Sequence, residues 1–180
     1  MKMNTSFVFH DGNSLTLLGE TAVVGGYAPD FTAIDTTGKA VRLSDFRGKI
    51  VVLSIFPSID TPVCARQARE FNRRAIDMSQ DVEVLALSKD LPFALARFCG
   101  AEGLDRIIAL SDYRHSEFGF KYGFLIRETM LLARGVVIID RQGLIAYVEY
   151  VADIAREPDY EQALAAVSMI LARGPREQDV

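Results

Sequence analysis

Two cysteines, Cys64 and Cys99, are the side chains of this sequence best suited to redox chemistry. A cysteine thiolate is a strong nucleophile, and its sulfur can be oxidised and reduced reversibly. The two lie too far apart along the chain to form a C-x-x-C dithiol, which disfavours thioredoxin-type disulfide exchange. They are also too few for a disulfide scaffold. In a reducing compartment, a disulfide between them is therefore expected to be transient and catalytic rather than structural.

Cys64 is predicted to lie in the first turn of a helix. Thr61 is a good N-cap residue and Pro62 fits the first helical position. Backbone N–H groups of the first turn lack intrahelical partners and the helix dipole adds partial positive charge, so both favour the thiolate. The hydroxyl of Thr61, one turn earlier, can reach the sulfur. The alternative is an inert core cysteine, because Cys64 also begins an apolar stripe with Ala68 and Phe71.

Cys99 closes a second, shorter helical stripe that begins at Leu91. Taken alone, Cys99 is best interpreted as a packed core thiol. A disulfide needs the two Cα atoms within about 7 Å, so bond formation between distant helices would require local unfolding of their ends. His10 and His115 stand at no metal-ligand spacing from either cysteine and lie in segments expected to be exposed, so a zinc site is disfavoured.

Four apolar runs rich in β-branched residues predict the strands that position these residues: 50–56, 82–88, 135–139 and 144–151. A helical segment separates the first two strands, so they should be parallel and joined by a right-handed crossover. A short turn separates the last two, which should form an antiparallel hairpin. Near-continuous apolar strands imply that both faces of the sheet are covered.

Helices are predicted where apolar residues recur at steps of three and four: 64–78, 91–98, 160–171 and, more weakly, 117–122. Near the N-terminus, Asp11-Gly12 between two short apolar segments predicts a β-hairpin. Together these elements predict an α/β thioredoxin-like fold, with a central mixed β-sheet flanked by helices. We expect one domain over residues 1–180, with the N-terminal hairpin at about 5–20 and the core at about 27–173.

Composition and charge disfavour several classes of function. The 180 residues are 49% apolar and 24% charged with a net charge of −4, as in an ordinary soluble globular protein. The sequence contains no basic run and no interleaving of basic with aromatic residues, so nucleic acid is not expected as a partner. The net negative charge argues against binding to anionic membranes. No apolar stretch approaches the roughly 20 residues that span a bilayer, and residues 1–13 do not resemble a signal peptide. The expected compartment is the cytoplasm.

The segment 57–64, Pro-Ser-Ile-Asp-Thr-Pro-Val-Cys, fits the peroxiredoxin signature of Pro, three residues, Thr, two residues and Cys. With Phe56 before it, this segment resembles the bacterial thiol peroxidase branch, the atypical two-cysteine peroxiredoxins. Three further strings resemble the same branch: Asp90-Leu-Pro-Phe-Ala94, Arg97-Phe-Cys-Gly-Ala-Glu-Gly-Leu104 and Glu157-Pro-Asp-Tyr160. The strings agree in order and spacing, and the resemblance extends over nearly the whole chain.

The resemblance implies a role for each candidate site residue. Cys64 would be the peroxidatic cysteine and Cys99 the resolving cysteine, while Thr61 would hydrogen-bond the thiolate and the peroxide. Pro57 would shield the sulfur from water, and Arg134 would match the active-site arginine of the family. Without the resemblance, Arg134 is best interpreted as a surface cation near a strand end.

The same resemblance implies a thiol-dependent peroxidase that reduces hydrogen peroxide and alkyl or lipid hydroperoxides. Cys64 would pass through a sulfenic acid to an intramolecular disulfide with Cys99, and thioredoxin would reduce that disulfide. No metal, haem or flavin cofactor is needed, and members of the family tend to form homodimers. Two alternatives stay open: a redox relay that senses peroxide and signals through the same disulfide, and a catalytically inert thioredoxin-like binding module.

Two features of the stretch before the third predicted strand depart from the family pattern. The loop 122–134 is expected to be shorter than in some relatives, and Gly135 stands where alanine is expected. Large apolar residues in this stretch could wall a groove for alkyl hydroperoxides, although plain core packing is the preferred interpretation: Phe124, Leu125, Ile126, Leu131 and Leu132.

Overall fold

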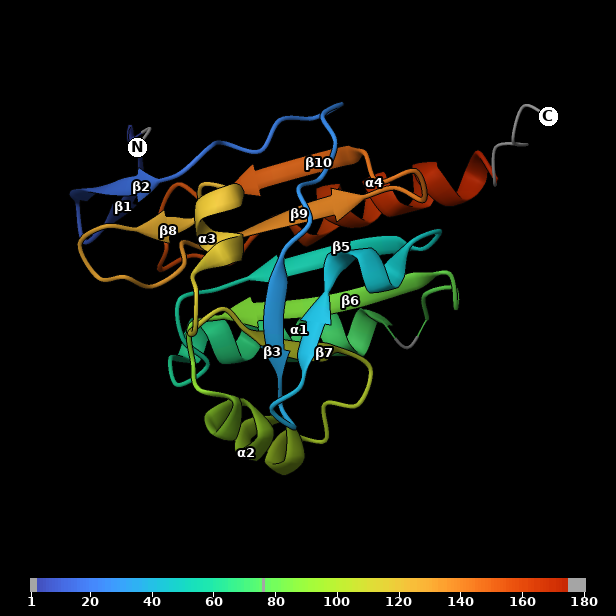
Figure 1. The fold of residues 1–180 in the computed structure, drawn as a ribbon, viewed down its shortest axis with the longest axis horizontal. Coiled ribbons are helices and arrows are strands. Elements are labelled where there is room, and N and C mark those ends of the chain that lie inside the picture. Colours follow the sequence, from blue (N-terminus) through green and yellow to red (C-terminus); the bar gives the residue numbers. More distant parts are fainter. Residues whose placement is uncertain (1–2, 76, 175–180) are drawn as a thin grey trace.

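The computed structural model describes residues 3–75 and 77–174 of the 180. These residues form two β-sheets with helices packed around them (Figure 1). The strands are β1 (Met3–His10), β2 (Asn13–Leu18), β3 (Thr32–Asp35), β4 (Ala40–Arg42), β5 (Ile50–Ile55), β6 (Val82–Ser88), β7 (Ile108–Ser111), β8 (Leu125–Ile126), β9 (Gly135–Ile139) and β10 (Ile145–Tyr150). The helices are η1 (Leu43–Phe46), α1 (Pro62–Ala75), α2 (Pro92–Glu102), α3 (Glu117–Lys121) and α4 (Tyr160–Ala172).

The larger sheet has the strand order β10-β9-β5-β6-β7-β3-β4 over the described residues. Strands β5, β6 and β7 are parallel to one another, and the other neighbouring pairs are antiparallel. Helix α1 joins β5 to β6 and α2 joins β6 to β7, which are the connections that parallel neighbours need. The predicted parallel pair, the predicted β9–β10 hairpin and the mixed sheet flanked by helices are confirmed.

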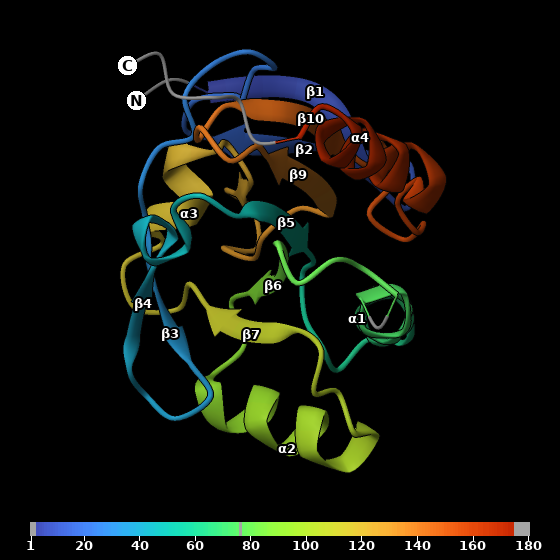
Figure 2. The same ribbon diagram turned by 90° about the vertical axis from the view of Figure 1, so that its right-hand side faces the viewer.

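Strand β5 is buried over its whole length. Val51, Leu53 and Ile55 belong to one hydrophobic cluster, whereas Ile50 and Val52 belong to the other, which is the period of two expected of a strand covered on both faces. Figure 2 shows α1 and α4 on one side of the sheet and α3 on the other. The apolar core therefore has two layers, one on each face of the sheet.

The predicted N-terminal hairpin is formed by β1 and β2, and β8 adds a third strand to this smaller sheet. The turn residues Asp11 and Gly12 both have positive φ angles, 49° and 77°, as a type I′ turn requires. Leu17 and Leu18 of β2 are buried in the same cluster as Phe118 of α3. The hairpin thus packs on the face of the large sheet opposite α1.

Several element boundaries differ from the sequence prediction. The short strands β3, β4, β7 and β8 were not predicted, because two to four residues are too few to establish a periodic pattern. Helix α1 ends at Ala75, whereas its apolar stripe continues to residue 78. Helix α2 continues to Glu102, and Gly103 ends it in the left-handed region with φ of 64°.

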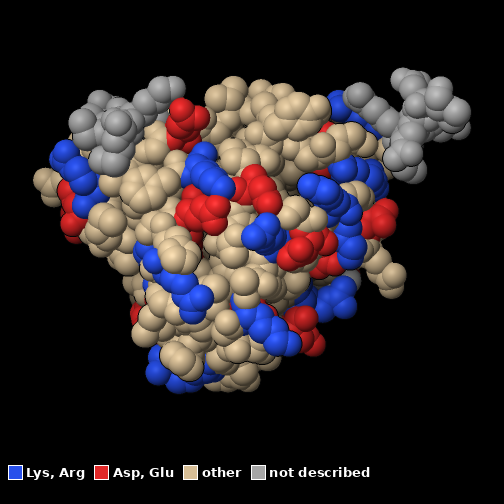
Figure 3. All heavy atoms as spheres, viewed as in Figure 1, with Lys and Arg blue, Asp and Glu red and all other residues tan. Residues whose placement is uncertain are grey.

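The surface mixes charges of both signs. Figure 3 shows basic and acidic side chains interspersed over the face in view. Some form ion pairs between elements, such as Arg69 of α1 with Glu102 of α2, and Arg74 of α1 with Glu161 of α4. None of the helices in the described part of the chain is long and apolar enough to cross a membrane.

Candidate active site

Cys64 lies just beyond the carboxyl end of strand β5. The chain leaves β5 at Ile55 and enters α1 at Pro62, so Cys64 is the third residue of the helix. Its side chain is 0% exposed. The hydroxyl of Thr61 lies 2.8 Å from the Cys64 Sγ and donates a hydrogen bond to it. The sequence prediction that Cys64 sits in the first helical turn, within reach of Thr61, is confirmed.

Arg134 reaches the same sulfur from a different part of the chain. It immediately precedes β9, and the antiparallel register pairs Gly135 with Ile55, the last residue of β5. Its guanidinium Nη2 donates a hydrogen bond to the Cys64 Sγ at 3.2 Å. The Arg134 side chain is only 1% exposed, so its interpretation as a surface cation is wrong. A buried cation beside a sulfur favours the thiolate over the thiol.

Gln67 holds the guanidinium of Arg134 in place. Its side-chain Oε1 accepts a hydrogen bond from Arg134 Nη1 at 2.7 Å. Its own amide donates to Ser54 Oγ at 2.9 Å and to the carbonyl oxygen of Ile55 at 3.2 Å. The third arginine contact, from Nε to the carbonyl oxygen of Ile154, is 2.8 Å long. Residues three apart share a helix face, so the available sequence signal for Gln67 was its spacing from Cys64.

A carboxylate near the surface adds negative charge in the neighbourhood of Arg134. Glu157 forms an ion pair with Arg66 of α1 at 2.8 Å and accepts a hydrogen bond from the hydroxyl of Tyr160. The Arg66 hydrogen bond, with smaller contributions from Tyr160 and from the charge of Arg134, holds the pKa of Glu157 below its usual value. This carboxylate is therefore ionised at neutral pH and ties α1 to the segment before α4.

Pro57 and Thr61 bracket the loop that leads to Cys64. Pro57, two residues beyond the end of β5, is buried, whereas Thr61 is exposed as a residue even though its hydroxyl faces the sulfur. The Thr61 Oγ1 also lies 3.2 Å from the carbonyl oxygen of Ser58, a second acceptor for its one hydroxyl proton. The Thr61 hydroxyl therefore has two acceptors within reach, the Cys64 sulfur and the Ser58 carbonyl oxygen.

Cys99 lies in α2 and is half-buried. Both cysteines are free thiols in this structure. Cys64 is part of the hydrophobic cluster beneath α1, and Cys99 packs against the same cluster. Burial raises the pKa of the Cys99 thiol, so this sulfur stays protonated over a wider pH range than a free cysteine. The structure thus holds two thiols on one apolar cluster, unbonded to each other.

Comparisons with known proteins place the chain in a family. The Redoxin family model matches residues 23–164. A thiol peroxidase of Oceanobacillus iheyensis is 45% identical over 160 residues, which cover 89% of this chain and 97% of that protein. A thiol peroxidase of Mycobacterium tuberculosis is 47% identical over 159 residues, covering 87% of this chain and 94% of that protein. This chain belongs to the Redoxin family.

Structural comparison agrees with this membership in the Redoxin family. The crystal structure of a peroxiredoxin-like protein from Aquifex aeolicus superposes with a TM-score of 0.86 and 34% sequence identity, over 92% of this chain and 98% of that one. Family and relatives together identify a thiol-dependent peroxidase of the peroxiredoxin type. They do not favour the alternatives of a signalling relay or an inert binding module.

A steric constraint explains why glycine, rather than the expected alanine, stands at position 135 of this Redoxin fold. A Cβ atom on Gly135 would lie 2.0 Å from the carbonyl oxygen of Glu149 and 2.6 Å from the ring of Phe124. Close packing of β10 and Phe124 against the strand that follows Arg134 therefore requires glycine. The departure from the expected alanine leaves Arg134 itself in position.

The apolar stretch after α3 is core rather than groove. Four of the five residues considered as a groove wall are at most 1% exposed and belong to the hydrophobic cluster on the hairpin side of the sheet: Phe124, Leu125, Ile126 and Leu132. The ring of Phe124 stacks on that of Tyr150 at 4.2 Å between centroids. Core packing is the correct interpretation of this stretch.

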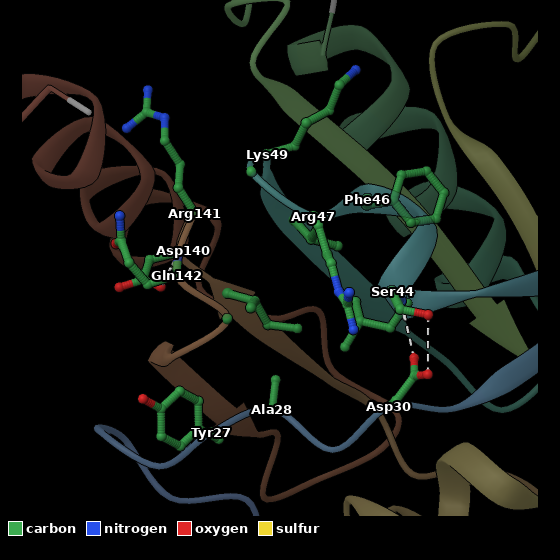
Figure 4. Close-up of a pocket in the computed structure, with 15 residues that line it drawn as sticks. Tyr27, Ala28, Asp30, Ser44, Phe46, Arg47, Lys49, Asp140, Arg141 and Gln142 are labelled. Atoms are coloured by element: carbon green, nitrogen blue, oxygen red, sulfur yellow. Dashed lines mark hydrogen bonds between the residues drawn. The ribbon is translucent and has the colours of Figure 1, made fainter. Parts of the chain in front are cut away.

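A cavity of about 360 Å³ lies at the opposite end of the β5–β9 pair from Cys64. Val51 and Ile139 contribute to its lining and pair with each other at the end of β9, where Arg47 and Arg141 also lie (Figure 4). Neither cysteine lines this cavity. Over residues 3–75 and 77–174, no three His, Cys, Asp or Glu side chains gather in a way that could hold a metal ion.

Proposed function

We propose that Cys64 is the nucleophile that attacks hydroperoxides and that Cys99 resolves its oxidised form. The observation that carries this proposal is the convergence of two donors on one buried sulfur, with Thr61 Oγ1 at 2.8 Å and Arg134 Nη2 at 3.2 Å from Cys64 Sγ. A hydrogen-bond donor and a cation both stabilise the anionic form of the sulfur. The position of Cys64 in the first turn of α1 adds the unpaired N–H groups of a helix start.

In the first step, the Cys64 thiolate attacks the terminal oxygen of a hydroperoxide, ROOH. The S–O bond forms while the O–O bond breaks, and the electron pair of that bond leaves on RO⁻, which takes up a proton to give ROH. Cys64 becomes a sulfenic acid. Arg134 and Thr61 would donate to the charge that develops on the oxygens, where fixed donors lower the barrier most. Buried Pro57 would keep bulk water away from the sulfur.

In the second step, the Cys99 sulfur attacks the sulfenic sulfur of Cys64, a disulfide forms, and water leaves. We expect the first turn of α1 to open for this step, because Cys64 is fully buried there and its sulfur must meet that of Cys99 in α2. An external dithiol then reduces the disulfide by two thiol exchanges. The three steps together convert ROOH and a dithiol into ROH, water and the oxidised dithiol.

Thioredoxin is the reductant that we propose, with the protein acting as a homodimer in the cytoplasm. The support is the resemblance of the sequence strings around Cys64 and Cys99 to the atypical two-cysteine peroxiredoxins. Turnover with thioredoxin, thioredoxin reductase and NADPH, compared with turnover on glutathione and glutaredoxin, tests the reductant. Sedimentation of the purified protein tests the dimer.

The roles of the two cysteines are tested by serine substitutions. Cys64→Ser should abolish peroxide consumption. Cys99→Ser should consume one equivalent of peroxide and then stop, because the sulfenic acid forms without being resolved. Mass spectrometry of the wild-type protein after one equivalent of peroxide should reveal a Cys64–Cys99 link. Peroxide turnover by Cys64→Ser, or normal cycling of Cys99→Ser on thioredoxin, would overturn the assignment.

A further inference from the structure

Asp90 lies between the two segments that carry the cysteines. It follows the end of β6 at Ser88 and precedes α2, the helix of Cys99. An aspartate just before a helix usually accepts a hydrogen bond from the first N–H groups of that helix. Here the N-cap residue is Leu91, and within the described chain no side chain caps the start of α2. The Asp90 carboxylate therefore does not cap α2 and is free to bind another part of the chain.

The Asp90 carboxylate binds the loop that leads to Cys64. Its Oδ1 accepts a hydrogen bond from Ser58 Oγ at 2.7 Å, and its Oδ2 accepts one from the Ile59 backbone N–H at 2.7 Å. The buried Ser88 hydroxyl donates a third hydrogen bond to Oδ2, also at 2.7 Å. Hydrogen bonds to an ionised acceptor are the stronger kind. Asp90 is itself fixed, because its carbonyl oxygen accepts from the hydroxyl of Ser111.

The same loop continues to the reactive sulfur through short contacts. The carbonyl oxygen of Ser58 accepts a hydrogen bond from the Thr61 N–H at 3.1 Å and lies 3.2 Å from the Thr61 hydroxyl. That hydroxyl lies 2.8 Å from the Cys64 Sγ. A displacement of Ser58 would therefore move the donor that faces the sulfur.

We propose that Asp90 is a positioning residue that holds the loop 57–61 in the conformation that reacts with peroxide and opposes the opening that disulfide formation needs. This inference rests on the proposed roles of Cys64 and Cys99. One carboxylate joins the loop of the first cysteine to the start of the helix of the second. The Asp90 carboxylate should favour the peroxide step, which uses the folded loop. It should slow the formation of the disulfide, which uses the opened loop.

Substitution of Asp90 by alanine separates these two effects. Without the carboxylate, the peroxide step should slow about tenfold, because hydrogen bonds to a charged acceptor that order Thr61 are lost. Formation of the Cys64–Cys99 disulfide from the sulfenic acid should accelerate by a similar factor, since the opened loop is more populated. Over-oxidation of Cys64 to the sulfinic acid at high peroxide should fall, because that reaction also needs the folded loop. Rapid-quench mass spectrometry follows all three species.

Three further variants separate positioning from general destabilisation. Asp90→Asn should restore much of the wild-type behaviour, because its oxygen can still accept from Ile59 while Ser58 turns its hydroxyl to accept from the new amide. Ser58→Ala, which removes one of the three donors, should shift both steps in the same directions as Asp90→Ala but less. Asp35→Ala is the matched control, because the Asp35 carboxylate also accepts three hydrogen bonds, from Thr37 and Lys39, in a turn between β3 and β4. It should change neither step.

The proposal is overturned if Asp90→Ala leaves both rates at the wild-type values, or if it slows both steps together. Thermal unfolding of each variant accompanies the kinetics, since a merely structural role predicts a lower melting temperature without opposite changes in the two rates. A failure of the proposed function itself would look different. In that case the wild-type protein would form no Cys64–Cys99 disulfide with peroxide, whatever the behaviour of Asp90→Ala.

Discussion

The sulfur of Cys64 is approached by one donor from the start of its own helix and by another from far along the chain. Thr61 immediately precedes α1, whereas Arg134 precedes β9 and is 1% exposed. The other contacts of the guanidinium are to neutral oxygens, those of the Gln67 amide and the Ile154 carbonyl. Because the Coulomb energy of a charge pair rises as the effective dielectric constant falls, a negative sulfur gains more from this buried arginine than from an exposed one.

Replacing Arg134 with alanine should slow the peroxide step by roughly 10²–10³-fold, the range for losing one fixed donor to developing charge. Stopped-flow peroxide consumption measures the rate, and thermal unfolding checks that the variant stays folded. Arg69→Ala, which removes an exposed ion pair between Arg69 of α1 and Glu102 of α2, is the control and should keep the wild-type rate. A wild-type rate for Arg134→Ala would contradict this role of the arginine.

Gln67→Leu should disturb the site without touching the sulfur directly. Leucine leaves Arg134 Nη1 without its acceptor in a buried position, which costs roughly 1–3 kcal/mol of unfolding free energy. A guanidinium held at fewer points should also slow the peroxide step. Urea unfolding and peroxide kinetics measure the two losses, and Gln80→Leu at an exposed position is the control. If stability falls while the peroxide step keeps its rate, Gln67 supports the fold but not the arginine.

The sequence predicts best those parts of the site that depend on near neighbours. Thr61 and Cys64 lie within one helical turn of each other, so capping rules place them together. Arg134 entered only through a family resemblance, because its approach to Cys64 depends on the register between β5 and β9. Gln67 was missed because a polar residue in an amphipathic helix ordinarily faces water. Here it is buried, turned toward a partner that the sequence pattern does not reveal.

At the scale of elements, the antiparallel pair β5–β9 brings the site together. It aligns Ile55 with Gly135, so the residue after one strand and the residue before the other emerge at the same end of the sheet. The long buried strands were predictable from their apolar runs, whereas β7 and β8 are defined by pairing with distant segments. The helix α2 contributes the second thiol, and its stability therefore bears on how readily that thiol can move.

Gly100→Ala should make the disulfide step slower. Gly100 lies within α2, next to Cys99, and an added Cβ would meet no described heavy atom within 4 Å. Alanine stabilises a helix interior by roughly 0.5–1 kcal/mol relative to glycine, so opening of α2 becomes rarer and the link forms about two- to fivefold more slowly. Ala101→Gly, on the exposed neighbour, should have the opposite effect. Rapid-quench mass spectrometry after peroxide measures the step, and equal rates in both variants would show that α2 stays folded during it.

Over the whole molecule, the two hydrophobic clusters on opposite faces of the sheet set which parts can open. Strands β5 and β9 are buried throughout and contribute side chains to both clusters, so separating them would disrupt both layers of the core. The first turn of α1 and the helix α2 each lie on one side of the sheet. Opening those segments would disrupt only one layer of the core, so we expect them to open more readily than the central strands.

Hydrogen exchange should therefore change in a restricted pattern when peroxide oxidises the protein. Backbone amides of residues 57–66 and 92–102 should exchange faster in the disulfide form than in the reduced form, because in the proposed two-cysteine cycle those segments open to let Cys64 and Cys99 meet. Amides of β5, β6 and β9 should keep their protection, because both core layers stay packed. Cys99→Ser treated in the same way is the control and should show no increase, since it forms no internal disulfide. Faster exchange throughout the central strands would mean that oxidation rearranges the whole fold, and the local opening on which the two-cysteine cycle depends would be the wrong description.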